Sequence, residues 1–153
     1  MSEQRLTGAA SPAGGGIYFA SKVIHAPRWR ALRAGGVPTI STWIDEAGEG
    51  QTADYAELAE RSLREIARAT AVVLYCEPGE LLKGALLEAG AALMHGTPVL
   101  CVGECDSLSR VFRKHPFWRE YPTVDTALAA ALHYRHHGLS HHHPDDDAGK
   151  GGT

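Results

Sequence analysis

Two glutamates, Glu77 and Glu88, lie eleven positions apart and are the strongest candidates for catalytic residues in the sequence. Glu77 directly follows an apolar run at 71–76, and Glu88 lies inside the largely apolar segment 84–95. Two carboxylates that flank a cleft suit cleavage of a glycosidic bond, in which one attacks or stabilises an oxocarbenium-like carbon and an acid assists the leaving group. The alternative interpretation is that Glu77 is an ordinary loop carboxylate and Glu88 an ordinary solvated helix residue.

A strand and the helix that follows it must position these carboxylates. The run at 71–76 is short, apolar and followed by a Pro-Gly pair, which predicts a buried parallel strand. The next segment predicts a helix from about Gly84 to His95, ended by Gly96. Glu88 then lies one turn into the helix, where the helix dipole favours a carboxylate. In an open parallel sheet that position faces the crevice where ligands bind.

The remainder of the chain alternates between strand and helix patterns. Further strands are predicted over 17–20, 37–44, 98–103 and, more briefly, 119–121. This alternation predicts an α/β domain over residues 16–137, with three layers and a flavodoxin-like or Rossmann-like arrangement. We expect a parallel sheet of four to five strands in the order 2-1-3-4-5, with right-handed crossovers. Neither the dinucleotide glycine motif nor a phosphate-loop lysine motif follows the first strand.

Length, composition and net charge limit the functions and the cellular location that we expect for the protein. Residues 1–15 predict a flexible arm and residues 138–153, rich in His, Asp and Gly, a disordered tail. With 153 residues and a net charge of −3, the chain suits one domain and gives no electrostatic case for binding a nucleic-acid polymer. No signal peptide or membrane-length apolar run is recognisable, so we expect no membrane partner and a cytoplasmic location.

Cysteine and histidine patterns give weaker indications of chemistry. Cys76 and Cys101 fall in strand-like apolar runs, where a buried thiol is the common role. The spacing of Cys101 and Cys105 is compatible with metal binding, but no second ligand pair accompanies it. The late histidines predict an adventitious metal site rather than a catalytic one; they are His136, His137, His141, His142 and His143. We therefore expect no metal and no other cofactor in the active site.

Three stretches resemble the nucleoside 2-deoxyribosyltransferase family and its deoxynucleotide N-glycosidase relatives. They are 17–20 (IYFA), 69–75 (ATAVVLY) and above all 83–99 (KGALLEAGAALMHGTPV). The last is similar to the family's Gly-Thr-x-x-Glu-x-Gly-x-Ala followed by Gly-Lys-Pro-Val. The resemblance covers roughly residues 16–133, and its most specific part is Gly84–Gly90.

The resemblance implies an enzyme that cleaves or transfers at the N-glycosidic bond of a nucleoside or nucleotide. Glu88 falls on the family's nucleophile, which attacks C1′ of a deoxyribosyl group and forms a glycosyl-enzyme ester. Tyr18 falls on a first-strand tyrosine close to the nucleophile, and Gly84 on the helix-entry glycine near the substrate. The family's precedent also implies a homo-oligomer whose neighbours complete each site, with the aromatic segment 115–121 as a candidate contact.

Several positions depart from the family pattern. Leu82 stands where an Asp or Ser often precedes the helix-entry glycine, and Ser62 where an Asp helps to hold the base. On its charged helix, Ser62 is expected to be a neutral surface or interface residue. A hydrogen bond to a buried ligand group that is left unmade costs about 1–3 kcal/mol. These departures leave three alternatives. The substrate differs from the family's usual one, other residues supply the contacts to it, or the chain binds a nucleotide-like ligand without turnover.

Six residues are candidates for those substrate contacts: Ser21, Trp43, Glu77, Lys83, Gly84 and Ala85. Trp43, with Tyr75, offers a surface on which a base could stack, although both residues are also expected as core residues at strand positions.

Overall fold

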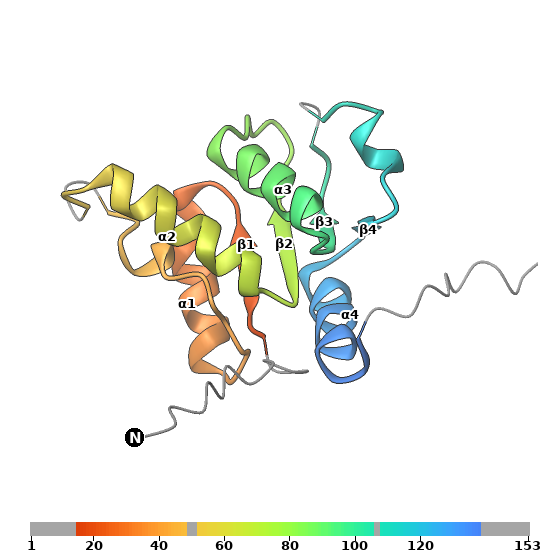
Figure 1. Ribbon diagram of the computed structural model, residues 1–153, viewed down its shortest axis with the longest axis horizontal. Helices are drawn as coiled ribbons and strands as arrows, with labels where there is room; N and C mark the ends of the chain where they lie inside the picture. The colour runs from red at the N-terminus through yellow and green to blue at the C-terminus, as the bar shows by residue number, and fades with distance from the viewer. Residues whose placement is uncertain (1–14, 49–51, 106–107, 139–153) are drawn as a thin grey trace, which may run out of the picture.

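In the part of the chain that the structure describes, four parallel strands form a sheet with helices on both faces (Figure 1). The computed structural model describes residues 15–48, 52–105 and 108–138. Nearly all of the predicted tail and nearly all of the predicted arm lie outside these residues. The elements are β1 (Ile17–Ala20), α1 (Ala26–Ala34), α2 (Tyr55–Arg68), β2 (Ala71–Tyr75), α3 (Gly84–His95), β3 (Val99–Val102), β4 (Trp118–Tyr121) and α4 (Val124–His137), with 3-10 turns at Val23–His25, Trp43–Asp45 and Phe112–Lys114.

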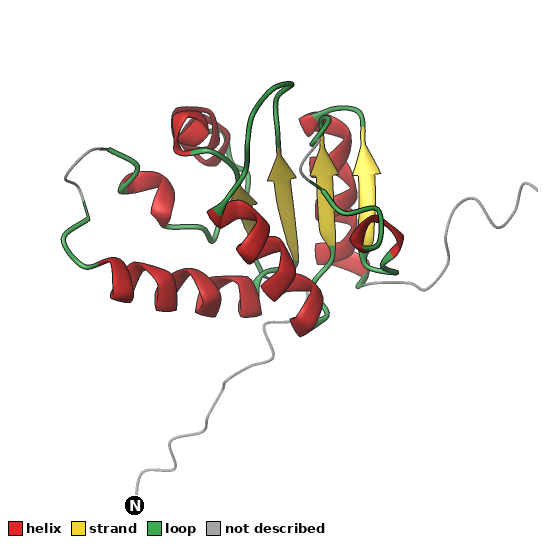
Figure 2. Cartoon of the chain, turned by 90° about the horizontal axis from the view of Figure 1, so that it is seen from above, coloured by secondary structure: helices red, strands yellow, loops and turns green. Residues whose placement is uncertain are grey.

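The sheet runs in the order β1-β2-β3-β4, and each neighbouring pair is parallel. Helices α2 and α3 cover one face, while α1 and α4 cover the other, which makes three layers (Figure 2). All residues of β1 and β3 are buried, because a parallel sheet covered on both faces hides every strand side chain. This arrangement agrees with the predicted α/β class and is consistent with a flavodoxin-like fold. Within the described ranges, no helix is long and apolar enough to cross a membrane.

The prediction of a second strand over 37–44 is wrong, so the sheet lacks one strand of the predicted order. Only Thr39 forms a bridge there, in parallel with Ile17, and Trp43–Asp45 is a 3-10 turn. At that bridge the Ile17 N–H donates to the Pro38 carbonyl and the Ile40 N–H donates to the Ile17 carbonyl. Beyond it, at Phe19, side chains replace the missing ladder on the outer edge of β1. The Phe19 N–H donates to Ser41 Oγ at 3.2 Å, and Trp43 Nε1 donates to the Phe19 carbonyl at 2.7 Å. Because these bonds satisfy the edge, the segment needs no strand backbone there.

The helix predicted around Glu88 has the predicted bounds. α3 begins at Gly84 and ends at His95, and Gly96 follows with a φ of +80°. That left-handed backbone is easily adopted by glycine and ends the helix. The short strand predicted at 119–121 is also present, as β4.

Gly103, directly after β3, offers a test of backbone packing. Its φ is +93°, and a Cβ added there would lie 2.0 Å from the carbonyl oxygen of Cys76. Gly103→Ala is therefore expected to lower the free energy of unfolding by about 3 kcal/mol or more, measured by urea denaturation, because strain and overlap add. Gly36→Ala is the matched control, since Gly36 has a φ of +101° with no atom within 4 Å of an added Cβ. Equal losses in the two variants would contradict the assigned overlap.

Candidate active site

A cavity of about 600 Å³ lies at the carboxyl ends of β1 and β2. Beyond β1 the chain turns to the outer edge at Thr39, whereas beyond β2 it leads to β3 on the opposite side. Such a divergence leaves a crevice where open α/β sheets bind ligands. The residues around the cavity are Ser21, Lys22, Val23, Ile24, Trp43, Leu58, Leu81, Leu82, Lys83, Gly84, Ala85 and Glu88. A mainly apolar wall with few polar groups is typical of a small-molecule site.

Glu88 is the one carboxylate among these lining residues, and its position is fixed by β1. Tyr18 OH donates a hydrogen bond of 2.9 Å to Glu88 Oε1. Tyr18 is completely buried and points from β1 towards α3, whereas its neighbour Phe19 stacks on Trp29 of α1 on the other face. This follows from the two-residue repeat of a strand, which sends successive side chains to opposite faces. The structure thus brings together two predicted site residues that are far apart in the sequence.

Burial controls the charge of Glu88. It raises the pKa of the carboxyl from an ordinary 4.5 to about 7; the hydrogen bond from Tyr18 opposes that shift, and the nearby charge of Glu65 adds to it. Burial also raises the pKa of Tyr18, as does the charge of Glu88, while a hydrogen bond with Ser62 lowers it. Tyr18 therefore remains a protonated donor, and Glu88 is poised between its charged and neutral forms at neutral pH.

Five of the predicted substrate contacts lie around this cavity: Ser21, Trp43, Lys83, Gly84 and Ala85. Trp43 is 8% exposed, and its bond to the Phe19 carbonyl holds the indole in the wall. Ser21 Oγ accepts from Trp29 Nε1 at 2.8 Å. At Gly84, no atom lies within 4 Å of an added Cβ, so the backbone at the start of α3 is open to a ligand.

Glu77 does not line this cavity, so the prediction that Glu77 and Glu88 face one crevice is not met. The exposed Glu77 side chain accepts a hydrogen bond of 2.9 Å from Tyr75 OH. Its backbone N–H donates to Glu80 Oε1 at 2.7 Å. Tyr75 is not a lining residue either; its ring packs edge-on against Trp29 and His25. The turn after β2 therefore directs Glu77 to a separate cluster.

Some residues of the site were not predicted from the sequence. The stretches 22–24 and 81–82 could have been found, because they follow the strand ends where a crevice was expected. Glu65 gave no such signal, since its place depends on bonds from Thr42 N–H and Thr42 Oγ1 across a loop. The prediction that Ser62 is a surface or interface residue is wrong for this chain alone, because Ser62 is 6% exposed.

Comparison with known proteins does not assign a family. No protein-family model matches the chain. A search of curated proteins also finds no match.

Proposed function

We propose that the protein cleaves or transfers at the N-glycosidic bond of a nucleoside or nucleotide, with Glu88 as the nucleophile. The observation that supports this most is the Tyr18–Glu88 pair at the wall of the cavity, with a half-buried carboxylate and a bond of 2.9 Å. The resemblance of 83–99 to the nucleoside 2-deoxyribosyltransferase family supports the same pair of roles. Trp43 offers an apolar wall for the base.

In the proposed reaction, a Glu88 carboxylate oxygen attacks C1′ of the sugar. The C1′–N bond breaks, its electron pair goes to the base nitrogen, and the departing base takes a proton from solvent water. Water or a second base then attacks C1′ of the glycosyl ester and loses a proton to solvent. The ester C1′–O bond breaks, which restores the carboxylate and leaves the free sugar or a new nucleoside. Two displacements at one carbon retain its configuration. Tyr18 holds Glu88 in position for both steps.

A second candidate function is binding of a nucleotide-like ligand without turnover. Leu82 favours this alternative, because it is 3% exposed and places an apolar side chain where the related family often has a polar contact. Ser62 favours it too, since it lies where that family has a base-holding carboxylate.

Incubation with a panel of deoxynucleosides and deoxynucleoside 5′-phosphates separates the two functions. We expect free base, detected by chromatography, from at least one member of the panel. Equilibrium dialysis with the same panel measures binding. Binding without release by the unmodified chain would replace the enzyme with the binding function, and the absence of both would overturn the two proposals.

The raised pKa of Glu88 predicts a pH dependence of the reaction. A nucleophile must be ionised, so kcat/KM is expected to rise with pH and to level off above about 7. Tyr18→Phe removes the hydrogen bond that lowers this pKa, so the midpoint of the rise is expected to move to higher pH. Initial rates of base release across a buffer series provide the measurement. A midpoint that is unchanged in Tyr18→Phe would contradict the role given to the hydrogen bond.

A further inference from the structure

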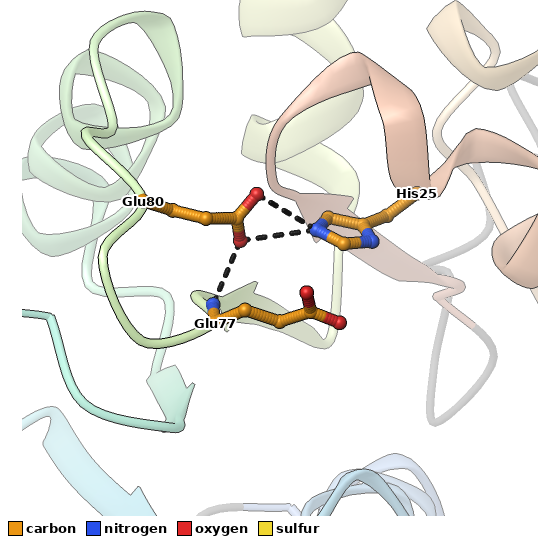
Figure 3. Close-up of side chains that lie close together, drawn as sticks. All are labelled: His25, Glu77 and Glu80. Atoms are coloured by element: carbon orange, nitrogen blue, oxygen red, sulfur yellow. Dashed lines mark hydrogen bonds and ion pairs between the residues drawn. The ribbon is translucent and has the colours of Figure 1, made fainter.

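A second cluster of side chains lies beside the cavity, where the loop after β1 meets the loop after β2. It consists of His25, Glu77 and Glu80, whose donor atoms all lie within 4.8 Å of one another (Figure 3). His25 Nε2 lies 3.0 Å from both carboxylate oxygens of Glu80. Lys22–Ile24 and Leu81–Leu82, next to these residues, line the cavity itself.

Neighbouring groups fix the direction of each side chain in the cluster. The His25 ring meets the Tyr75 ring edge-on, with centroids 4.9 Å apart and planes at 90°. Tyr75 OH holds the Glu77 carboxylate, and the Glu77 N–H holds that of Glu80. His25 and Glu80 side chains are only 12% and 14% exposed. Outer partners of this kind orient ligands and tune their strength in metal sites.

We propose that His25, Glu77 and Glu80 form a site for a divalent transition-metal ion of the Zn²⁺ type. One imidazole nitrogen and two carboxylate oxygens make a ligand set that zinc accepts, with a further position left for water. In a tetrahedral zinc site the ligand atoms lie about 3.3 Å apart, given metal–ligand distances of about 2.0–2.1 Å. His25 and Glu80 are already near that separation, and the Glu77 carboxylate, within 4.8 Å of both, would move closer to them when the ion binds.

The charges around the cluster favour the binding of a cation with moderate affinity. Glu77 and Glu80 supply two carboxylates to the cluster, and His25 Nε2 lies 3.0 Å from the carboxylate of Glu80. Lys22 and Arg28, whose guanidinium lies 4.9 Å from the Tyr75 ring centre, offset part of the negative charge. We therefore expect affinity in the micromolar range and a preference for Zn²⁺ over Mg²⁺, because imidazole is a poor ligand for magnesium. The bound ion would fix two walls of the cavity to each other.

The test must first remove the late histidines, which are predicted to bind metal adventitiously. The background is the full chain with five substitutions to Asn, at His136, His137, His141, His142 and His143. Isothermal titration of this background with Zn²⁺ is expected to give one site, and titration with Mg²⁺ none. No saturable Zn²⁺ binding, or equal affinity for Mg²⁺, would overturn the proposal.

Ligand variants in the same background locate the ion. His25→Gln, Glu80→Gln and Glu77→Gln are each expected to weaken Zn²⁺ binding by at least about tenfold. His95→Gln, on the exposed end of α3, is the control and is expected to bind as the background does. Glu77 is exposed, so Glu77→Gln tests the site without disturbing the interior. Unchanged affinity in folded Glu77→Gln or His25→Gln would overturn the three-ligand site.

Two further measurements test whether Zn²⁺ binds to the folded chain through His25, and whether this binding is independent of the proposed glycosyl chemistry at Glu88. Zn²⁺ is expected to raise the Tm of the background but not that of His25→Gln, because only the folded chain presents the ligands. Glu88→Gln is expected to retain full Zn²⁺ affinity, since Glu88 is not part of the cluster. An equal rise in Tm for His25→Gln, or a loss of Zn²⁺ binding in Glu88→Gln, would overturn the assignment.

Discussion

Glu88→Gln is expected to abolish the release of free base, with kcat/KM lower by a factor on the order of 10⁴ or more. The amide has nearly the shape of the carboxylate but cannot attack C1′ and form the glycosyl ester, and loss of a nucleophile typically has effects of this size. Glu88 is also the only carboxylate among the residues that line the cavity, so no neighbour in the described wall can replace it. Chromatographic assay of the substrate identified from the panel provides the measurement. A variant with more than about a tenth of the original activity would remove Glu88 from the mechanism.

The stability of Glu88→Gln shows whether a loss of activity comes from the missing nucleophile or from unfolding. The pKa of Glu88 is higher in the folded chain than in the unfolded chain, so the folded chain binds the proton more tightly. The free energy of unfolding is therefore expected to fall as pH rises from about 4.5 to about 7. Glu88→Gln removes this cost and is expected to be at least as stable as the original chain at pH 8, by urea denaturation. A large loss of stability at pH 8 would mean that the lower activity of Glu88→Gln reflects unfolding rather than loss of the nucleophile.

Trp29→Ala is expected to lower the free energy of unfolding by about 3–5 kcal/mol. Trp29 is completely buried between α1 and the sheet. Its ring stacks on Phe19 with centroids 4.6 Å apart and lies edge-on to Tyr75 at 5.3 Å. Truncation leaves a void beneath the first strand and also removes the donor to Ser21 Oγ. Urea or guanidinium denaturation measures the loss.

Leu87→Ala provides the control for that prediction. Leu87 is also a large apolar residue on a helix, but it is 79% exposed. Its truncation is expected to change the free energy of unfolding by no more than about 0.5 kcal/mol in the monomer. A loss as large as that of Trp29→Ala would indicate that the α3 surface is covered in solution.

Local sequence patterns predicted an element correctly where its structure depends mainly on its own residues. The bounds of α3 follow from an apolar repeat and from Gly96 and Pro98, which a single helix can satisfy. The segment 37–44 has β-branched residues typical of a strand, yet Ser41 and Trp43 satisfy the edge of β1 with their side chains. That choice depends on tertiary contacts that no local pattern contains.

The candidate site divides in the same way. The Tyr18–Glu88 pair was predicted from the resemblance, and the alternating faces of β1 explain why the two residues meet. Glu77 was placed with them because it follows a strand, as crevice residues do. The short turn at 77–80 instead folds back on itself through the bond from the Glu77 N–H to Glu80, which directs the side chain elsewhere. The spacing of residues in the sequence does not predict the geometry of so short a turn.

The pairing of β1 with β2 has a consequence for how the chain is made. Ile17 aligns with Ala71, and the whole of α1 and α2 lies between them in the sequence. During synthesis, the apolar segment IYFA emerges long before its partner and has no neighbouring backbone on that side until β2 has left the ribosome. The nascent chain therefore passes through an interval in which this segment is open to aggregation, and slower translation between the two strands would lengthen it.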